Sequence, residues 1–152
     1  MSLEPIRQVW GDERRSTKVT DAIKEIYPDW VFYGTPPFFF TDYHVQRRRD
    51  NGRENYIGDL EIKWLNQPAS TPAKFPFQKL QKILIAPPYN DNAQHRICFR
   101  FNDGLLLIPA IILGDITPEF TTRHDTGERD LNVIFMAENY CQYWIEKVVN
   151  DN

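Results

Sequence analysis

The sequence contains little cysteine and no long apolar run. Its 152 residues include two cysteines, Cys98 and Cys141, too few for a disulfide framework or a zinc site, so we expect a reducing, intracellular compartment. The longest uninterrupted apolar stretch runs from Leu105 to Leu113 and contains Pro109, whereas a membrane-spanning helix needs about 20 apolar residues. The first twenty residues carry charges throughout and no apolar block, so we expect no secretory signal.

Several catalytic signatures are also missing from the sequence. It has no glycine-rich loop of the G-x-x-x-x-G-K-S/T or G-x-G-x-x-G type, no H-E-x-x-H motif and no G-x-S-x-G turn. These absences argue against the common nucleotide-binding loops, zinc proteases and serine hydrolases. The three histidines, His44, His95 and His124, lie far apart and none has a convincing nucleophile partner. A catalytic triad is therefore not expected.

Aromatic and charged residues, by contrast, are plentiful. They make up 14% and 26% of the chain, which is typical of an ordered globular protein and predicts one domain over residues 1–152. The net charge of −3 by itself disfavours a nucleic-acid partner. Lys and Arg nevertheless outnumber Asp and Glu by 13 to 11 up to Lys82, and are outnumbered by 5 to 10 after it. A polyanion would therefore meet the first half, which holds the arginine cluster of Arg47, Arg48, Arg49 and Arg53.

Hydrophobic periodicity predicts both helices and strands. Asp12 is a candidate N-cap for a helix that ends before Pro28, and Pro76 opens a helix that Pro87 and Pro88 stop. The expected elements are, in order, a helix over 12–27, strands over 30–33, 38–48 and 56–65, a loop over 66–74, a helix over 77–86, strands over 96–101 and 105–113, a mobile loop over 117–130, a strand over 131–136 and a C-terminal helix over 140–149. This order predicts an α/β or α+β fold with a mixed central sheet flanked by helices.

One predicted strand alternates strictly between charged and apolar residues. Its charged members, Asp59, Glu61 and Lys63, share one face, and its apolar members take the other. A turn signal at residues 50–52 makes this strand the antiparallel partner of the strand before it. Residue 42 then lies opposite residues 61 to 63. We therefore expect Asp42, Glu61 and Lys63 in one patch, with Asp59 next to it.

Two carboxylates and a lysine in one patch suit phosphodiester hydrolysis. Carboxylates from adjacent strands offer the oxygen ligands that a hard divalent cation such as Mg²⁺ prefers, beside waters and the phosphate of a substrate. A neighbouring lysine stabilises the charge that develops on the phosphorane, or helps to generate hydroxide from a metal-bound water. The patch is therefore a candidate metal-dependent hydrolytic site.

The same residues carry a resemblance to a known family. Asp42, followed after a hairpin by Glu61-Ile62-Lys63, resembles the signature of the PD-(D/E)XK nuclease superfamily, although Thr41 stands where the signature has proline. The expected element order over about residues 12–112 also resembles the αβββαβ core of that restriction-endonuclease-like fold. The resemblance implies a metal-dependent endonuclease acting on DNA, either a structure-selective enzyme such as a junction resolvase or a restriction or homing type.

The resemblance also implies a role for each matching residue. Asp42, Glu61 and the backbone carbonyl of Ile62 would bind Mg²⁺ or Mn²⁺, and Lys63 would be the catalytic lysine. Asp59 is an alternative or additional ligand, because it shares a face with Glu61.

Further residues are candidates for the rest of such a site. Many superfamily members carry an additional acidic residue in the first helix, and Glu13 and Glu25 both fit. The helix after the motif often presents polar side chains to the substrate, which Gln78, Lys79 and Lys82 match. The arginine cluster would contact phosphates without reading sequence. Cutting both strands requires two copies, so we expect a homodimer or a higher oligomer.

The same patterns also fit other interpretations. A strand with one wet face shows alternating charges, as in a non-enzymatic α/β binding or assembly module with a solvated charged strand. The arginine cluster fits a solvated strand end, and an RNA-cleaving or RNA-binding domain is compatible with the sequence. Phe38-Phe39-Phe40 is more typical of a core strand than of a base-stacking platform. His44 shares the Asp42 face and is a candidate to line the site.

Overall fold

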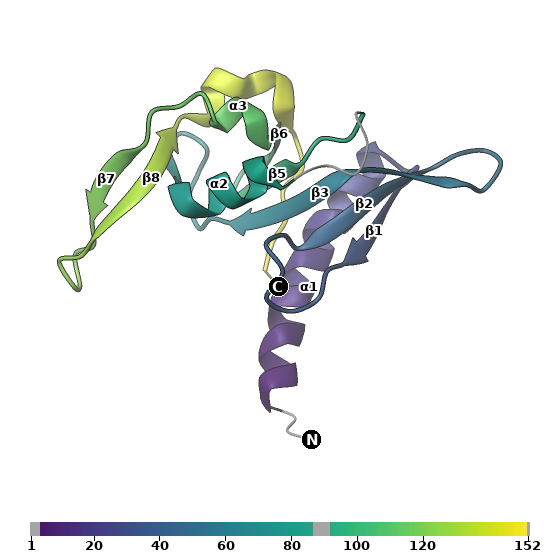
Figure 1. Cartoon of the computed structure of the whole chain (residues 1–152), viewed down its shortest axis with the longest axis horizontal. Helices are drawn as coiled ribbons and strands as arrows, with labels where there is room; N and C mark the ends of the chain where they lie inside the picture. The colour runs from purple at the N-terminus through teal and green to yellow at the C-terminus, as the bar shows by residue number, and fades with distance from the viewer. Residues whose placement is uncertain (1–3, 87–91, 152) are drawn as a thin grey trace.

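The computed structural model describes residues 4–86 and 92–151, with side chains from residue 15 onward. The chain begins with helix α1, Glu4–Ile26 (Figure 1). Its predicted end before Pro28 is confirmed. The predicted start at Asp12 is wrong, because the helix already begins at Glu4. Pro5 suits that first turn, where its missing N–H would have no helical partner.

Three antiparallel strands follow α1: β1 Trp30–Gly34, β2 Tyr43–Arg48 and β3 Glu54–Trp64. The predicted hairpin between the second and third strands is confirmed. The predicted start of the second strand at residue 38 is wrong, because residues 35–42 form a loop. Pro36 and Pro37 cannot donate to a strand ladder, and Phe38 has a left-handed φ of 70°.

The chain then forms β4, Ala73–Pro76, and α2, Phe77–Ile85. The helix begins directly after Pro76, as predicted, while the predicted stop at Pro87 and Pro88 lies outside the described residues. Strand β4 replaces part of the predicted loop. It is a strand because it pairs with residues far along the chain, Ala73 opposite Phe135, and local periodicity carries no sign of that pairing.

Strands β5 Arg96–Phe101 and β6 Gly104–Pro109 extend the sheet of β1 to β3. Strand β5 is parallel to β3 and antiparallel to β6. Within the described residues, this six-stranded mixed sheet has the order β1-β2-β3-β5-β6-β9. The predicted strand over 105–113 is too long, because β6 ends at Pro109 and the short helix α3, Ala110–Leu113, follows it.

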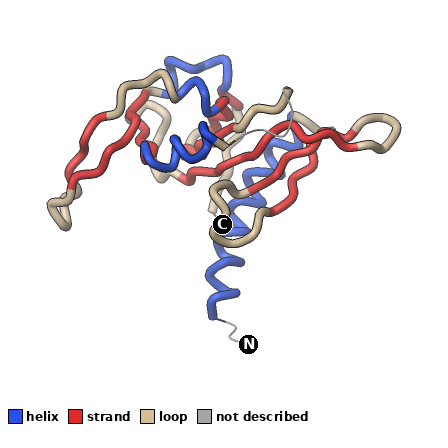
Figure 2. Tube along the Cα trace, viewed as in Figure 1, coloured by secondary structure: helices blue, strands red, loops and turns tan. Residues whose placement is uncertain are grey.

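Two predictions near the C-terminus are wrong. The expected mobile loop contains β7 Glu119–Thr122 and the start of β8 Arg129–Phe135, which form a projecting hairpin (Figure 2). The described residues place β7 and β8 in a three-stranded sheet of order β4-β8-β7. The expected C-terminal helix is instead a 3-10 segment η1, Ala137–Tyr143, followed by β9, Trp144–Ile145, which pairs with the edge of β6.

Apolar side chains pack on both faces of the six-stranded sheet. Helix α1 covers one face with Val19 and Ile23, against Leu60 and Cys98 among others. The other face packs Phe99 under α2, α3 and the small sheet. The predicted α+β class is therefore confirmed, with helices on a mixed sheet. In the part of the chain that the structure describes, no helix is long and apolar enough to span a membrane.

Candidate active site

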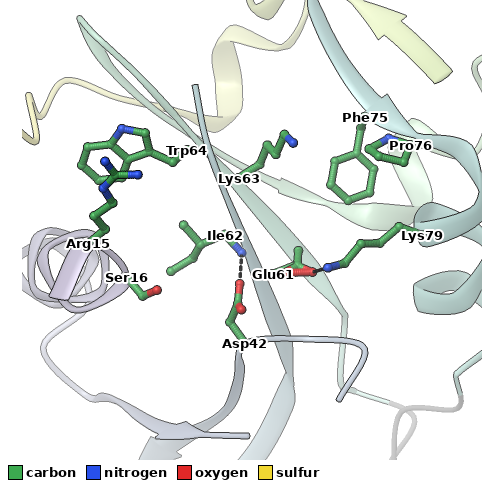
Figure 3. Close-up of a pocket in the computed structure, with 10 residues that line it drawn as sticks. All are labelled: Arg15, Ser16, Asp42, Glu61, Ile62, Lys63, Trp64, Phe75, Pro76 and Lys79. Atoms are coloured by element: carbon green, nitrogen blue, oxygen red, sulfur yellow. Dashed lines mark hydrogen bonds and ion pairs between the residues drawn. The ribbon is translucent and has the colours of Figure 1, made fainter. Parts of the chain in front are cut away.

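A cavity of about 330 Å³ opens at the end of β3, between α1 and α2 (Figure 3). We call it the carboxylate cavity. It contains the predicted patch and residues that sequence periodicity did not place there. Its lining consists of Arg15, Ser16, Asp42, Glu61, Ile62, Lys63, Trp64, Phe75, Pro76 and Lys79.

The cavity exists because β2 stops pairing before β3 ends. The Asp42 N–H donates to the Leu60 carbonyl, and the next outward-facing amide, that of Ile62, donates to Asp42 Oδ2 at 2.7 Å. The side chain of Asp42 thus replaces a strand partner. Since the N–H and C=O of one strand residue point to the same side, the Ile62 carbonyl oxygen also lies on the Asp42 side. The structure therefore brings together Asp42, Glu61 and Ile62, as predicted.

Glu61 is buried, with 4% of its surface exposed. Burial raises the pKa of its carboxyl group to about 8, and the hydrogen bond and negative charge of the neighbouring Asp42 carboxyl group add to the rise. The Lys79 ammonium acts in the opposite direction, since its Nζ lies 2.6 Å from Glu61 Oε2. The Lys79 ammonium is thus the cationic group in contact with the buried Oε2 of Glu61.

Two lysines reach the carboxylate cavity from different elements. Lys63 follows Glu61 by two residues on the same face of β3, is half-buried and lines the cavity. Lys79 comes from the first turn of α2 and is the lysine in contact with Glu61. The sequence assigned Lys79 to substrate contact, whereas in the structure it neutralises a buried carboxylate.

Asp59 lies outside the carboxylate cavity, although it is 2% exposed. Thr41 Oγ1 donates to its Oδ2 at 2.9 Å, the Tyr56 hydroxyl donates to its Oδ1 at 2.6 Å, and His44 Nδ1 lies 2.6 Å from the same oxygen. These contacts engage both carboxylate oxygens. The interpretation of a solvated charged strand is therefore wrong for Asp59 and Glu61, which are both buried.

The donor set fits a hard divalent cation. A Mg²⁺ ion binds proteins through one or two carboxylates and keeps several waters, and the cavity supplies Asp42, Glu61 and the Ile62 carbonyl. The buried Glu61 Oε2 already contacts one cation, the Lys79 ammonium at 2.6 Å, and is an oxygen that a divalent cation would bind in its place. Within the described residues, no three His, Cys, Asp or Glu side chains cluster as a complete metal cage, so waters or substrate would complete the coordination.

Other predicted site residues lie away from the carboxylate cavity. Glu25 pairs with Lys147, while the side chain of Glu13 lies outside the described part of the chain. Gln78 and Lys82 are exposed on α2 and do not line the cavity. The arginine cluster lies at the tip end of the β2–β3 hairpin, where Arg47 pairs with the exposed Asp29 and Arg48 with the half-buried Glu54, each at 3.5 Å.

Sequence reasoning missed Arg15, which reaches the cavity from α1. Its guanidinium lies 5.5 Å from the Trp64 ring and donates two hydrogen bonds to the Asp151 carboxylate at 3.0 and 2.9 Å. A signal was available, because Arg15 precedes Val19 by four residues on the same helical stripe. Comparison with known proteins adds nothing to this geometry, because no family model, curated protein or solved structure matches the chain.

Proposed function

We propose that this chain is a metal-dependent nuclease that hydrolyses phosphodiester bonds in DNA. The observation that carries the proposal is the contact of two carboxyl groups, Asp42 and Glu61, in a cavity that also holds Lys63 and Lys79. The carboxylates can bind a metal ion, and the neighbouring lysines can bind a phosphate. A metal-dependent phosphodiesterase needs both in one site, because the metal ion must contact the phosphate that is cut.

The order of elements supports the same proposal. Helix α1, the antiparallel strands β1 to β3, α2, and β5 running parallel to β3 follow one another along the chain. Strand β4, which belongs to the three-stranded sheet, lies between β3 and α2. Apart from β4, this order resembles the αβββαβ arrangement of the PD-(D/E)XK superfamily, whose signature the motif residues also resemble. Asp42 stands before the second strand and Glu61 to Lys63 on the third, at the positions where that superfamily carries its signature.

Asp42, Glu61 and the Ile62 carbonyl would hold the ion, Mg²⁺ or Mn²⁺. When bound, it supplies a Lewis acid that polarises the phosphate and lowers the pKa of a coordinated water. Glu61 can become a ligand only by losing its proton and loosening its pair with Lys79. The Lys79 ammonium, 44% exposed at its side chain, is then available to an incoming phosphate.

Lys63 and Arg15 supply positive charge on either side of the reacting phosphate. Lys63 lies one side-chain row beyond Glu61, where its ammonium stabilises the charge of the phosphorane. Arg15 lines the α1 wall and its planar guanidinium suits a phosphate. We further propose that two copies act together on duplex DNA, because each copy provides one such site and would cut one strand.

A cleavage assay tests this function. Wild-type protein is incubated with supercoiled plasmid, with linear, nicked, branched and single-stranded DNA, and with RNA, in Mg²⁺, Mn²⁺ or EDTA. We expect DNA cleavage with either ion and none in EDTA. Lys63→Ala should slow cleavage by about 100-fold or more, while Lys74→Ala, an exposed lysine on β4, should not change the rate.

Three outcomes would contradict the proposal. Cleavage by Lys63→Ala at the wild-type rate would remove the assignment of this site. Cleavage confined to RNA would overturn the substrate class. An absence of cleavage on every substrate with both ions would favour the non-enzymatic binding module.

A further inference from the structure

A second cavity, of about 250 Å³, lies on the sheet surface near Asp42, and we call it the aromatic cavity. It is lined by Tyr33, His44, Gln46 and Tyr56. The register explains this grouping, because Tyr33 lies opposite His44 across β1 and β2, and Gln46 opposite Tyr56 across β2 and β3. His44 follows Asp42 by two residues, so the aromatic cavity lies one side-chain row, about 6–7 Å, from the carboxylates.

The rings of the aromatic cavity are held in fixed positions. Tyr56 and His44 are both hydrogen-bonding partners of Asp59 Oδ1, each at 2.6 Å, and the Tyr33 hydroxyl donates to Glu54. Rings oriented in advance lose little conformational entropy when a flat ligand stacks on them. The Gln46 amide adds one acceptor and two donors at the same surface.

An exposed phenylalanine stands on the loop beside this cavity. Loop 35–42 is closed by hydrogen bonds from the Thr35 N–H to the Asp42 carbonyl and from the Phe39 N–H to the Pro36 carbonyl, at 3.0 and 3.1 Å. The Phe39 ring lies 5.3 Å from the His44 ring. Phe38 is fully exposed and adopts a left-handed φ of 70°.

Both properties of Phe38 cost free energy. A bulky residue at positive φ is strained, and an exposed Phe forgoes the stabilisation that burial of its ring would give. Its neighbours Phe39 and Phe40 pack against each other with ring centroids 4.6 Å apart. The loop therefore holds one of three consecutive phenylalanines out in solvent, which is the opposite of the core strand that the sequence predicted.

We propose that the aromatic cavity, with Phe38 at its side, binds an unpaired nucleobase of the substrate next to the phosphate that is cut. This inference rests on the proposed nuclease function and narrows its substrate to DNA with an unpaired or displaced base, as in a gap or at a branch. A base inside an intact duplex has both faces covered by stacking, and an aromatic platform contacts only a base that has left the stack.

The geometry favours a nucleobase over a second copy of this chain. The aromatic cavity is one side-chain row, about 6–7 Å, from the carboxylates, so a base beside the phosphate at the carboxylates can reach it. A stable protein interface buries about 800 Å² on each partner. The exposed aromatic surface of this loop is the ring of Phe38 and part of Phe39, which is far smaller than such an interface.

Binding is measured apart from cleavage with the full-length Lys63→Ala variant in Mg²⁺. The probes are oligonucleotides that carry 2-aminopurine at one position, either in a gap or in an intact duplex of the same sequence. We expect quenching of the gapped probe and a preference for it of about 5-fold or more, because stacking on one aromatic side chain is worth about 1–3 kcal/mol. Adding Phe38→Ala or Gln46→Ala should remove most of this preference.

The matched control is Phe120→Ala, since Phe120 is also an exposed aromatic residue but lies on β7 of the far hairpin. Thermal unfolding of each variant verifies that it folds. An unchanged preference in both Phe38→Ala and Gln46→Ala would overturn the proposal. So would a dimer that dissociates in Phe38→Ala, seen by sedimentation, without any change in quenching. Quenching by Lys63→Ala together with no cleavage of any substrate by the wild-type protein would overturn the nuclease function and support the base-binding cavity.

Discussion

At the scale of single residues, the Glu61 carboxyl group is subject to opposing effects. Burial and the adjacent Asp42 carboxyl group favour its protonated form, while the Lys79 ammonium at 2.6 Å favours the ionised form. Burial is the largest of these effects, and the pKa is raised to about 8. Near neutral pH the metal-free pair of carboxyl groups therefore retains a proton, which a metal ion must displace.

This raised pKa predicts how stability depends on pH. The folded protein binds the Glu61 proton more tightly than the unfolded chain, so the stabilisation is complete below about pH 4.5 and is lost as pH rises through about 8. Glu61→Gln removes this dependence. In EDTA, the stability of wild type relative to Glu61→Gln should fall between pH 5 and 8 by a few kcal/mol, at about 1.4 kcal/mol for each pKa unit.

Urea denaturation at pH 5, 7 and 9 measures this difference. Glu128→Gln is the control, because that exposed carboxylate is part of a surface pair with Arg123, and it should keep the wild-type pH dependence. If Glu61→Gln shows the same dependence as wild type, Glu61 does not carry a raised pKa.

Asp59 has a structural role that a test of stability can separate from metal binding. Its carboxylate accepts hydrogen bonds from Thr41 and Tyr56 and contacts His44 while 2% exposed. Asp59→Asn places an amide NH₂ group against the hydroxyl donors of Thr41 and Tyr56. We therefore expect the free energy of unfolding, measured by urea denaturation, to fall by about 2–4 kcal/mol. Thr41→Val, which removes one donor, should cost about 1 kcal/mol. A fully stable Asp59→Asn that has lost Mn²⁺ binding would instead make Asp59 a metal ligand.

The sequence allowed part of this site to be predicted. Strand periodicity and one turn suffice to bring Asp42 to Glu61, because both are local properties of a hairpin. The contact of Lys79 with Glu61 depends on how α2 packs across the sheet, and the place of Arg15 depends on α1. Those positions follow from tertiary packing, which cannot be predicted from the periodicity of the sequence.

At the scale of elements, the predictions succeeded where one face is apolar. The end of α1 and the start of α2 follow from apolar stripes that are buried as expected. Strand β5 lies where its alternation predicted it, but both of its faces are buried, Arg100 included. Strand β7 escaped prediction because its four residues are mostly exposed and polar, and pairing with β8 makes it a strand. The stripe that predicted a C-terminal helix belongs to η1 and β9, whose Trp144 packs beside Phe101.

Strand β3 needs glycine at position 58. Gly58 has φ of 122°, and a Cβ there would lie 1.8 Å from the backbone oxygen of Gln94, which crosses at that point. Gly58→Ala should therefore destabilise the protein by about 3 kcal/mol or more. Gly34→Ala is the matched control, since a Cβ at Gly34 meets nothing within 4 Å, and it should change stability by less than about 1 kcal/mol. Equal stabilities in urea denaturation would contradict this account of β3.

At the scale of the whole molecule, β3 connects the two surfaces that we propose to contact DNA. The carboxylate cavity lies at its C-terminal end, and the arginine cluster lies beside its N-terminal end, about 20 Å away for six residues of strand. Arg47, Arg49 and Arg96 line a further cavity of about 490 Å³ there. The net charge of −3 therefore does not describe the surface that a nucleic acid would meet.

This separation predicts that the arginine cluster affects affinity and leaves catalysis unchanged. Each phosphate contact that is lost should reduce the slope of log K against log salt by about 1. We therefore expect Arg47→Ala and Arg49→Ala to weaken binding of gapped and intact DNA equally, and to leave the cleavage rate at saturating DNA unchanged.

Arg129→Ala is the control and should keep the full slope, because Arg129 lies in the β7–β8 hairpin, where its side chain lies over Phe120. Fluorescence anisotropy from 50 to 300 mM salt measures these slopes. A wild-type slope in Arg47→Ala and Arg49→Ala would mean that the cluster is a solvated strand end, and DNA would then be bound through the cavities alone.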